Sequence, residues 1–437
     1  MRSARTRTLQ SVAIVGAGFE GTLAASWLAH TCRGTGVRIT LVPVPGVECC
    51  DSAYCALPAR PDDLLSPLGI SDLTLLKACQ ASFALGVTLG ERTLPFGSVG
   101  LDFAGSDFHH HWLLTDREEP YFAYSPAWQA MQASKFAPPV SRNAIGPLQH
   151  EFTRLMDIRA LTHVLTDGLD ARGVQVTAPL DATLEDLADD ERRLKLVDGD
   201  TLDADLIIDA RGNAASEAQL WLQSSMEDGS ASHPAYTLAF AQSGWELTLP
   251  LAKATLNLRV QRERDEIDGP PWQGHRVRIG AAAHALTPLL PWYSSLLMRS
   301  IRRLAAWLPP AGNEANHRQA FNQQTLADIA SLRSANALVE SALGNTDDDL
   351  PLSALELWRK RGVWHDPDCT LLNRWDWISL LFALGHLPAT HDPLAERFPA
   401  ELRAQQCARL RSEIGRVTSG FPTLSEYLAA AQQAGQK

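Results

Sequence analysis

The spacing of apolar residues near the start of the chain predicts a strand–helix–strand unit. A short apolar, β-branched run at residues 12–15 (VAIV) precedes three glycines, Gly16, Gly18 and Gly21, and apolar positions then recur at helical spacing. Residues 37–42 (VRITLV) form the next strand-like run. A strand, a glycine turn, a helix and a second strand in this order indicate a βαβ unit with parallel strands.

Helix and strand patterns alternate through the middle of the chain, and helical periods dominate after Pro288. Two strand-like runs, YTLAFA and ATLNLRV, are separated by Gly244 and Pro250, which favour a break between them. We predict a helix at 157–171, strands at 174–177, 192–197 and 205–210, two antiparallel strands within 236–260, and helices at 294–307 and 314–343.

This order of elements predicts an α/β fold. It indicates a nucleotide-binding domain with an inserted antiparallel sheet on its substrate side, followed by a helical C-terminal part. We assign residues 1–310 to the α/β domain, with substrate-side segments at about 60–150 and 220–275, and residues 311–437 to the helical region.

The charge and hydropathy of the chain narrow the classes of function. The 437 residues carry a formal net charge of -11, which disfavours sequence-independent binding to nucleic acid because phosphates need a basic surface. No apolar run reaches the roughly 18 residues that span a membrane, and the basic first residues lack the apolar core of a secretory signal. We therefore expect a cytoplasmic protein with no nucleic-acid or membrane partner.

The seven cysteines do not indicate a disulfide framework, because their number is odd. Cys49, Cys50 and Cys55 form one cluster, which lacks a second ligand pair at zinc-like spacing. We expect free buried thiols, with a redox or metal-linked role for the cluster as the alternative.

Residues 16–21 (GAGFEG) match the glycine pattern of a dinucleotide-binding turn. The first glycine allows the tight turn, the second lets the backbone approach a pyrophosphate, and the third allows the helix to pack closely on the strand. The N–H groups at the start of the helix favour phosphate. An acidic residue to hold the ribose is absent after the second strand, which ends in Val42, so these contacts are expected elsewhere, for example from the main chain. Glu48 and Asp51 are carboxylates a little downstream.

Three further segments resemble the FAD signatures of a flavoprotein family. Residues 203–212 (DADLIIDARG) resemble a strand closing in Asp-Ala-(Ser/Arg)-Gly, and residues 157–161 with 171–174 resemble the helix and strand that lead to it. Residues 278–289 (RIGAAAHALTPL) resemble the Gly-Asp-Ala-Ala…Pro stretch that runs under the flavin. Together with the glycine turn, they resemble the flavin-dependent tryptophan halogenases and the single-component aromatic hydroxylases. The resemblance implies a GR2-type FAD-binding Rossmann-like domain.

The same resemblance implies which residues hold FAD. Glu20, inside the glycine turn, is expected to approach the isoalloxazine ring. The implied cofactor-binding residues are Gly16, Ala17, Gly18, Phe19, Glu20, Gly21, Val42, Arg159, Asp209, Gly212, Gly280, Ala281 and Pro288.

The resemblance spans nearly the whole chain, but the residues of halogen chemistry are replaced. A halogenase resembling this chain has a lysine two residues before the glycine of Gly-Val, where this chain has Ala84. The second tryptophan of the family's Trp-x-Trp-x-Ile-Pro segment is Leu247 here. At the halide site, which resembles Pro-Leu-Glu-Ser-Thr-Gly, Leu290 replaces the carboxylate and Pro291 removes one N–H donor.

This combination implies an FAD-dependent monooxygenase that hydroxylates an electron-rich aromatic ring. Reduced flavin and O2 give a C4a-hydroperoxide, which delivers its hydroxyl directly to an indole when no halide intercepts it. The electrons are expected from NAD(P)H or from a separate flavin reductase. The resemblance also suggests a substrate, a tryptophan within a partner protein during tryptophylquinone cofactor biogenesis. The alternatives are a halogenase with relocated residues, a non-catalytic FAD-binding maturation partner, and a reductase of the same fold.

Four residues are candidates for substrate contact or acid–base catalysis. His109 and His111 belong to a run of three histidines and would share one face of a strand. They lack a third metal ligand that the sequence identifies, so no metal site is predicted. Trp292 and Tyr293 follow the flavin stretch and are expected to contact the substrate or to fill the former halide pocket.

Overall fold

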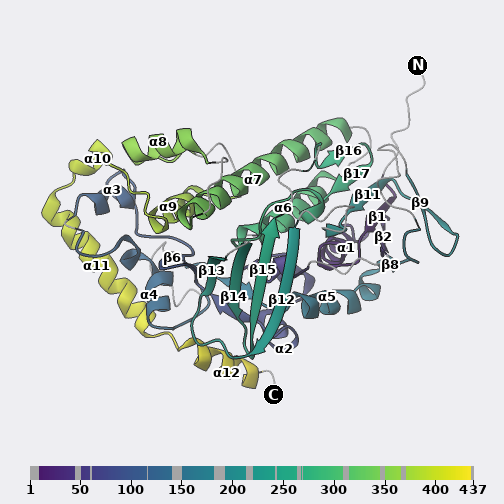
Figure 1. Ribbon diagram of the computed structural model, residues 1–437, viewed down its shortest axis with the longest axis horizontal. Helices are drawn as coiled ribbons and strands as arrows, with labels where there is room; N and C mark the ends of the chain where they lie inside the picture. Colours follow the sequence, from purple (N-terminus) through teal and green to yellow (C-terminus); the bar gives the residue numbers. More distant parts are fainter. Residues whose placement is uncertain are drawn as a thin grey trace.

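The computed structural model is a mixed α/β molecule in which helices α7 to α12, within residues 314–434, lie above, to the left of and below the large sheet that faces the viewer (Figure 1). None of the helices in the described ranges is both long and apolar enough to cross a membrane. The structure describes residues 9–44, 51–59, 62–115, 117–139, 150–181, 192–212, 220–241, 244–262, 267, 269–308, 314–344, 350–365 and 371–434.

The first sheet contains the predicted βαβ unit. Strand β1 (Ser11–Val15) pairs in parallel with β2 (Arg38–Val42) and with β11 (Leu206–Asp209), and helix α1 (Phe19–Thr31) connects β1 to β2. The predicted parallel pairing is therefore confirmed. The strand order is β16-β17-β11-β1-β2-β8. The remaining strands are β8 (Gln175–Val176), β16 (Trp272–Gln273) and β17 (Arg276–Arg278).

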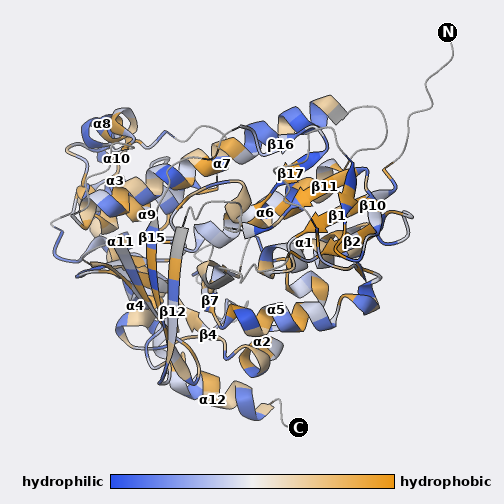
Figure 2. Cartoon of the chain, turned by 45° about the vertical axis from the view of Figure 1, so that its right-hand side comes forward, coloured by the Kyte–Doolittle hydropathy of each residue, from blue (hydrophilic) through white to orange (hydrophobic). Residues whose placement is uncertain are grey.

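Alternate residues of β1 enter two different apolar cores, because side chains alternate between the two faces of a strand. Val12 and Ile14 pack in the main core with α1, whereas Ala13 and Val15 pack with Leu194 in a smaller core. Leu194 lies in the hairpin of β9 (Arg193–Lys195) and β10 (Thr201–Asp203). Figure 2 shows β1, β2 and β11 as a largely hydrophobic block.

The second sheet corrects the prediction of two strands within residues 236–260. Strand β14 (Gly244–Pro250) lies between β13 (Tyr236–Ala241) and β15 (Ala254–Arg262) and pairs antiparallel with both. Gly244 is the first residue of this strand and does not break it. A Cβ at this position would lie 2.4 Å from the carbonyl oxygen of Val260, so only glycine permits the close pairing with β15. Pro250 ends the strand. The sheet is completed by β5 (Gly86–Leu89), β6 (Arg92–Pro95) and β12 (Leu220–Asp228).

A third, small sheet lies beside these two. Its order is β3-β7-β4, with β3 (Ala56–Pro58) and β4 (Ser82–Ala84) both antiparallel to β7 (Thr153–Leu155). Only one residue, Leu85, lies between the end of β4 and the start of β5, so the small sheet continues directly into the second sheet.

Helix α6 (Trp292–Trp307) is packed centrally. It contacts α1 of the first sheet, β3 of the small sheet and the long helix α7 (Glu314–Ala342). The predicted helices at 294–307 and 314–343 are therefore confirmed, as is the helical C-terminal part. The other helices are α2 (Asp72–Ala78), α3 (Phe108–Leu113), α4 (Pro126–Gln132), α5 (Ile158–Asp167), α8 (Leu352–Arg361), α9 (Arg374–Ala383), α10 (Pro393–Glu396), α11 (Ala400–Ser419) and α12 (Leu424–Ala434).

Candidate functional site

The glycine turn after β1 is as tight as its sequence predicts. A Cβ on Gly16 would lie 2.3 Å from the carbonyl oxygen of Ala210, and the φ angle of Gly16 is +111°. A Cβ on Gly21 would lie 1.9 Å from the carbonyl oxygen of Gly16. These two glycines therefore allow α1 to pack against the ends of β1 and β11.

The outer side of this turn suits a phosphate group. Gly18 precedes α1 and has no side chain to cap the N–H groups of the first turn. Ala17 is exposed, whereas Phe19 is fully buried and anchors the start of the helix. Backbone N–H groups at an uncapped helix start bind anions, so this side of the turn fits a pyrophosphate.

The backbone carbonyl groups at the end of β2 accept hydrogen bonds from other parts of the fold. Gly16 N–H donates to the carbonyl oxygen of Val42, and Leu180 N–H donates to that of Pro43. A ribose contact by Val42 remains a prediction. Glu48 lies outside the described residues, and Asp51 begins a short 3-10 helix at Asp51–Tyr54.

The second FAD signature contains a buried ion pair. The two carboxylate oxygens of Asp209 accept hydrogen bonds from Arg211 at 2.9 and 3.0 Å, and one also accepts from Arg276 at 2.7 Å. Burial by itself raises the pKa of Asp209, but the two guanidinium groups outweigh this effect and hold the pKa below its usual value. We therefore expect the Asp209 side chain to fix the end of β11 and not to contact FAD directly.

Glu20 connects the first glycine turn to the stretch that the sequence places under the flavin. Its side chain is buried, and one carboxylate oxygen accepts a hydrogen bond from the N–H of Ala281 at 2.9 Å and another from the hydroxyl of Tyr54. Gly280 makes room for this carboxylate, because a Cβ there would lie 2.3 Å from its carbon atom. The structure therefore brings Glu20, Gly280 and Ala281 together. Gly212 is also near, since a Cβ there would lie 4.0 Å from the second Glu20 oxygen.

Two buried aromatic residues and a histidine extend this cluster. The rings of Tyr54 and Tyr293 are 5.2 Å apart, and those of Tyr293 and His284 are 5.3 Å apart. Burial, together with the charge of Glu20, raises the pKa of Tyr54 well above its usual value, so its hydroxyl stays protonated. Burial lowers the pKa of His284 to about 3, and neither of its ring nitrogens has a hydrogen-bond partner among the described residues.

Sequence reasoning did not single out Tyr54 or His284 as site residues. His284 lies within the recognised flavin stretch and could have been chosen on that ground. Tyr54 lies in no recognised motif, and only the tertiary fold brings it to Glu20.

The other two predicted cofactor residues lie at the edges of this region. Arg159 is exposed in the first turn of α5, where its N–H donates to the side chain of Asp157. Pro288 is buried and follows Thr287, whose carbonyl oxygen accepts a hydrogen bond from Asn336 at 2.7 Å. Whether Arg159 contacts FAD remains a prediction.

Trp292 and Tyr293 point to different places from the start of α6. Trp292 lines a cavity, while Tyr293 is almost fully buried in the cluster with Tyr54. The cavity has aromatic, apolar and charged walls. Its lining residues are Pro58, Asp62, Phe96, Glu151, Phe152, Thr153, Pro291, Trp292, Ser295, Arg299, Leu371, Asn373 and Asp376.

The residue at the position of the family lysine, Ala84, does not line this cavity but pairs with a residue that does. Ala84 is fully buried in β4 and lies opposite Thr153 of β7, which lines the cavity. Pro291, which also lines the cavity, precedes the first residue of α6. Leu290 is buried beside it. Lys77, which lies earlier in the chain, is exposed on α2.

The structure corrects the predicted geometry of the histidine run. His109 and His111 lie in helix α3, not in a strand, and residues two apart on a helix point in nearly opposite directions. His109 donates from Nε2 to the carbonyl oxygen of Gly362 at 2.8 Å, and His111 donates from Nε2 to that of Phe103 at 2.9 Å. Neither lines the cavity beside Trp292. A catalytic role for either residue gains no support from this placement.

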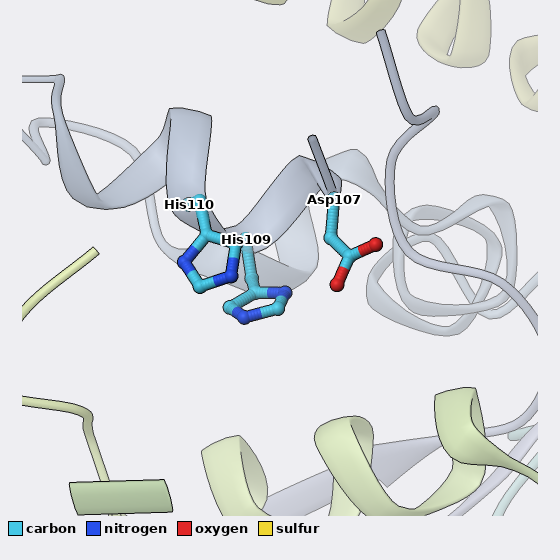
Figure 3. Close-up of side chains that lie close together, drawn as sticks. All are labelled: Asp107, His109 and His110. Atoms are coloured by element: carbon cyan, nitrogen blue, oxygen red, sulfur yellow. The ribbon is translucent and has the colours of Figure 1, made fainter. Parts of the chain in front are cut away.

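Asp107, His109 and His110 lie close enough to suggest a metal site (Figure 3), because a ligand atom from each lies within 4.8 Å of the others. However, the N–H of Asp392 donates to Nδ1 of His110, so the neutral ring carries its proton on Nε2. Asp107 is paired with Arg374. Two of the three side chains are therefore engaged in other interactions, whereas Nδ1 of His109 has no hydrogen-bond partner among the described residues. The expectation that this run holds no metal stays a prediction.

The described cysteines are thiols. Cys32, Cys55, Cys79 and Cys407 form no disulfide, and burial raises the pKa values of Cys55 and Cys79 to about 12. These two side chains therefore stay protonated and unreactive at neutral pH. Cys49 and Cys50 lie outside the described residues.

Comparison with known proteins places the chain among halogenase-like flavoproteins. No curated protein sequence matches it significantly. BrvH, a flavin-dependent halogenase from Brevundimonas sp. BAL3, is 21% identical with a TM-score of 0.82, and the alignment covers 97% of this chain and 99% of BrvH. SttH, a tryptophan 6-halogenase from Streptomyces toxytricini, is 16% identical with a TM-score of 0.81 and coverages of 97% and 100%. MibH, a lanthipeptide tryptophan 5-halogenase, is 17% identical with a TM-score of 0.75 and coverages of 99% and 95%.

These structures share the fold of this chain, including its helical C-terminal part. At sequence level, the family model described as tryptophan halogenase matches residues 11–255, which is more than half of the chain. That match includes the glycine turn, the position of Ala84 and the second FAD signature. The chain belongs to the tryptophan halogenase family.

Proposed function

We propose that this chain is an FAD-dependent monooxygenase that hydroxylates an electron-rich aromatic ring. The observation that carries the proposal is the methyl group of Ala84, which lies opposite a cavity-lining residue where a halogenase resembling this chain has a lysine. A methyl group has no hydrogen-bond donor and no charge, so it cannot handle hypohalous acid. Leu290 and Pro291 likewise replace a carboxylate and an N–H donor, and Pro291 lines the same cavity.

The described residues fit FAD at the carboxyl end of β1. Gly16 and Gly18 shape the turn, the uncapped start of α1 suits the pyrophosphate, and Glu20 with Ala281 lies where the signatures converge. Bound reduced FAD would supply two electrons to O2, so that one oxygen atom enters the ring and the other leaves as water. Tyr293 and Leu290, both buried, would exclude water from this side of the site.

The cavity beside Trp292 suits an aromatic ring. Trp292, Phe96 and Phe152 provide aromatic surface for the ring. Burial raises the pKa values of Asp62 and Glu151, whereas the guanidinium groups of Arg299, which lines the cavity, and Arg302 act against this at Asp62. We propose an indole as the ring that binds here, either as a small molecule or within a peptide.

A tryptophan within a partner protein is the specific substrate that we propose, on a route to a tryptophylquinone cofactor. MibH, which shares the fold, acts on a lanthipeptide by its description, and this supports a peptide-borne tryptophan as a substrate of the fold. We propose that NAD(P)H or a separate flavin reductase provides the electrons.

Mass spectrometry of a substrate panel tests this function. The panel contains tryptamine, free tryptophan and an intact protein with an accessible tryptophan, each incubated with the FAD-loaded enzyme, a reductant and isotopically labelled O2. We expect at least one substrate to gain one labelled oxygen atom. The proposal fails if none gains label while the absorption spectrum shows that the enzyme carries FAD.

Halogenation is the second candidate, and membership of the tryptophan halogenase family favours it. It requires a residue other than Ala84 to handle the halogenating species. A product that gains bromine or chlorine only when the corresponding halide is present would establish this function and exclude simple hydroxylation.

A further inference from the structure

The stretch that resembles the flavin-side signature lacks a carboxylate that its pattern contains. The pattern reads Gly-Asp-Ala-Ala, and this chain has Gly280 followed by Ala281. A different acidic residue, Glu20, stands in the first glycine turn, more than 250 positions earlier. The two changes are far apart in sequence but meet in the fold.

The carboxylate of Glu20 lies directly against the residues that replace the pattern. The N–H of Ala281 donates to it at 2.9 Å, and Gly280 has a φ angle of +57°, with no side chain to displace it. A Cβ on Gly280 would lie 2.3 Å from the carboxylate carbon. Residue 281 has no carboxylate of its own, but the carboxylate of Glu20 lies against its backbone N–H.

The local structure holds this charge in one position. Glu20 is 2% exposed, and the protonated hydroxyl of Tyr54 donates to the same oxygen that accepts from Ala281. A buried carboxylate is stable only when hydrogen bonds replace those of water, and these two donors supply them at one of its two oxygens. Tyr54 is itself packed against Tyr293 and Phe19, so aromatic rings surround the hydroxyl-bearing side chain that contacts Glu20.

We propose that Glu20 supplies from the first glycine turn the carboxylate that position 281 lacks, and that it accepts a hydrogen bond from a hydroxyl group of bound FAD. Its second oxygen lies near Gly212 of the second FAD signature, so all three cofactor-binding segments meet at this side chain. FAD offers hydroxyl donors along its ribityl chain, which suit a fixed carboxylate acceptor. This inference rests on the proposed binding of FAD.

A carboxylate exchange tests the inference by FAD affinity, without reference to turnover. The dissociation constant of FAD is measured by quenching of flavin fluorescence for wild type, Glu20→Ala, Glu20→Gln and the double variant Glu20→Ala with Ala281→Asp. We expect Glu20→Ala to weaken FAD binding about tenfold or more, because a hydrogen bond to a charged acceptor is lost. The double variant should recover most of that loss. Glu401→Ala, at an exposed position of α11, is the control and should bind like wild type.

Three results would overturn the inference. FAD binding by Glu20→Ala that equals or exceeds wild type would mean that Glu20 does not bind the cofactor or obstructs it. A weakened Glu20→Ala that Ala281→Asp does not rescue would mean that the carboxylate is not exchangeable between the two positions. If Glu20→Ala does not fold, as judged by circular dichroism, unchanged FAD affinity of Glu20→Gln would show that the negative charge of residue 20 contributes nothing to FAD binding, which contradicts a role as the missing carboxylate. Wild type that binds no FAD would instead overturn the proposed function itself.

Discussion

At the scale of single residues, the cofactor region depends on glycines that leave no space for a side chain, such as Gly16 and Gly21, and on the buried carboxylate of Glu20. The glycines of the first turn were predictable, because a close backbone approach leaves a local sequence pattern. The role of Tyr54 was not predictable, because its contact with Glu20 joins segments that no short motif relates. Position 281 shows the same limit, since its alanine is understood only beside Glu20.

Gly21→Ala is expected to disrupt the first turn. The new Cβ would lie 1.9 Å from the carbonyl oxygen of Gly16, which is backbone and cannot move aside. We expect a loss of about 1–3 kcal/mol in the free energy of unfolding, together with weakened FAD binding. Chemical denaturation measures the first effect. Gly415→Ala in α11, where the nearest neighbour is the flexible side chain of Gln129, is the matched control and should cost little stability.

Asp209→Asn is expected to destabilise the fold. It removes the charge that pairs with Arg211 and Arg276 and leaves the buried Arg211 guanidinium uncompensated. We expect the free energy of unfolding to fall by about 3–5 kcal/mol. The control is Asp203→Asn, which breaks an exposed pair with Arg193. Equal melting temperatures for the two variants would show that the buried pair is not important for stability.

At the scale of elements, α6 connects the two parts of the site. Its first two residues separate the substrate side from the flavin side, since Trp292 lines the cavity and Tyr293 packs on Tyr54. Helical periodicity predicted α6 and α7 correctly because both have long apolar faces. Two other elements were misread. The histidine run lies in a helix of six residues, too short for a periodic signal, and Gly244 lies within a strand because it allows close pairing.

Variants of Trp292 and Tyr293 should affect substrate binding and flavin binding separately. We expect Trp292→Ala to weaken binding of the aromatic substrate about tenfold, because it removes ring contact surface, and to leave FAD affinity unchanged. Tyr293→Phe keeps the ring but loses the hydroxyl next to Tyr54, so its effect should appear in the flavin absorption spectrum. Isothermal titration with substrate and with FAD measures both affinities. A parallel loss of both affinities in Trp292→Ala would contradict this separation.

At the scale of the whole molecule, the fold brings together segments that lie far apart in the sequence, such as Glu20 and Ala281. The sequence predicted the α/β class and the helical C-terminal part, because these follow from periodicity. It did not predict which surfaces meet. The cavity beside Trp292 takes residues from the small sheet, from α6 and from the start of α9, and only tertiary packing unites them.

Stability should fall as the solution becomes acidic, because three histidines are buried in the neutral form. Burial lowers the pKa values of His109 and His284 to about 3 and that of His110 to about 4. Below about pH 6.5 the unfolded chain binds protons that the folded protein does not, so each histidine lowers stability by about 1.4 kcal/mol per pH unit. We expect denaturation midpoints to decrease from pH 7 to pH 5. In His284→Gln, which cannot be protonated at this position, the slope should be smaller. An unchanged slope in this variant would show that His284 is protonated in the folded protein.

The partition of one product between oxygen and halogen tests the central claim most directly. FAD-loaded enzyme is reduced and then supplied with labelled O2, excess bromide and an amine-bearing indole. The mass of the product is measured by mass spectrometry. Ala84, at the position where a halogenase resembling this chain has a lysine, predicts a product with one labelled oxygen, in an amount that bromide does not change. A brominated product would contradict the account, because it would mean that this site still performs halogen chemistry with other residues.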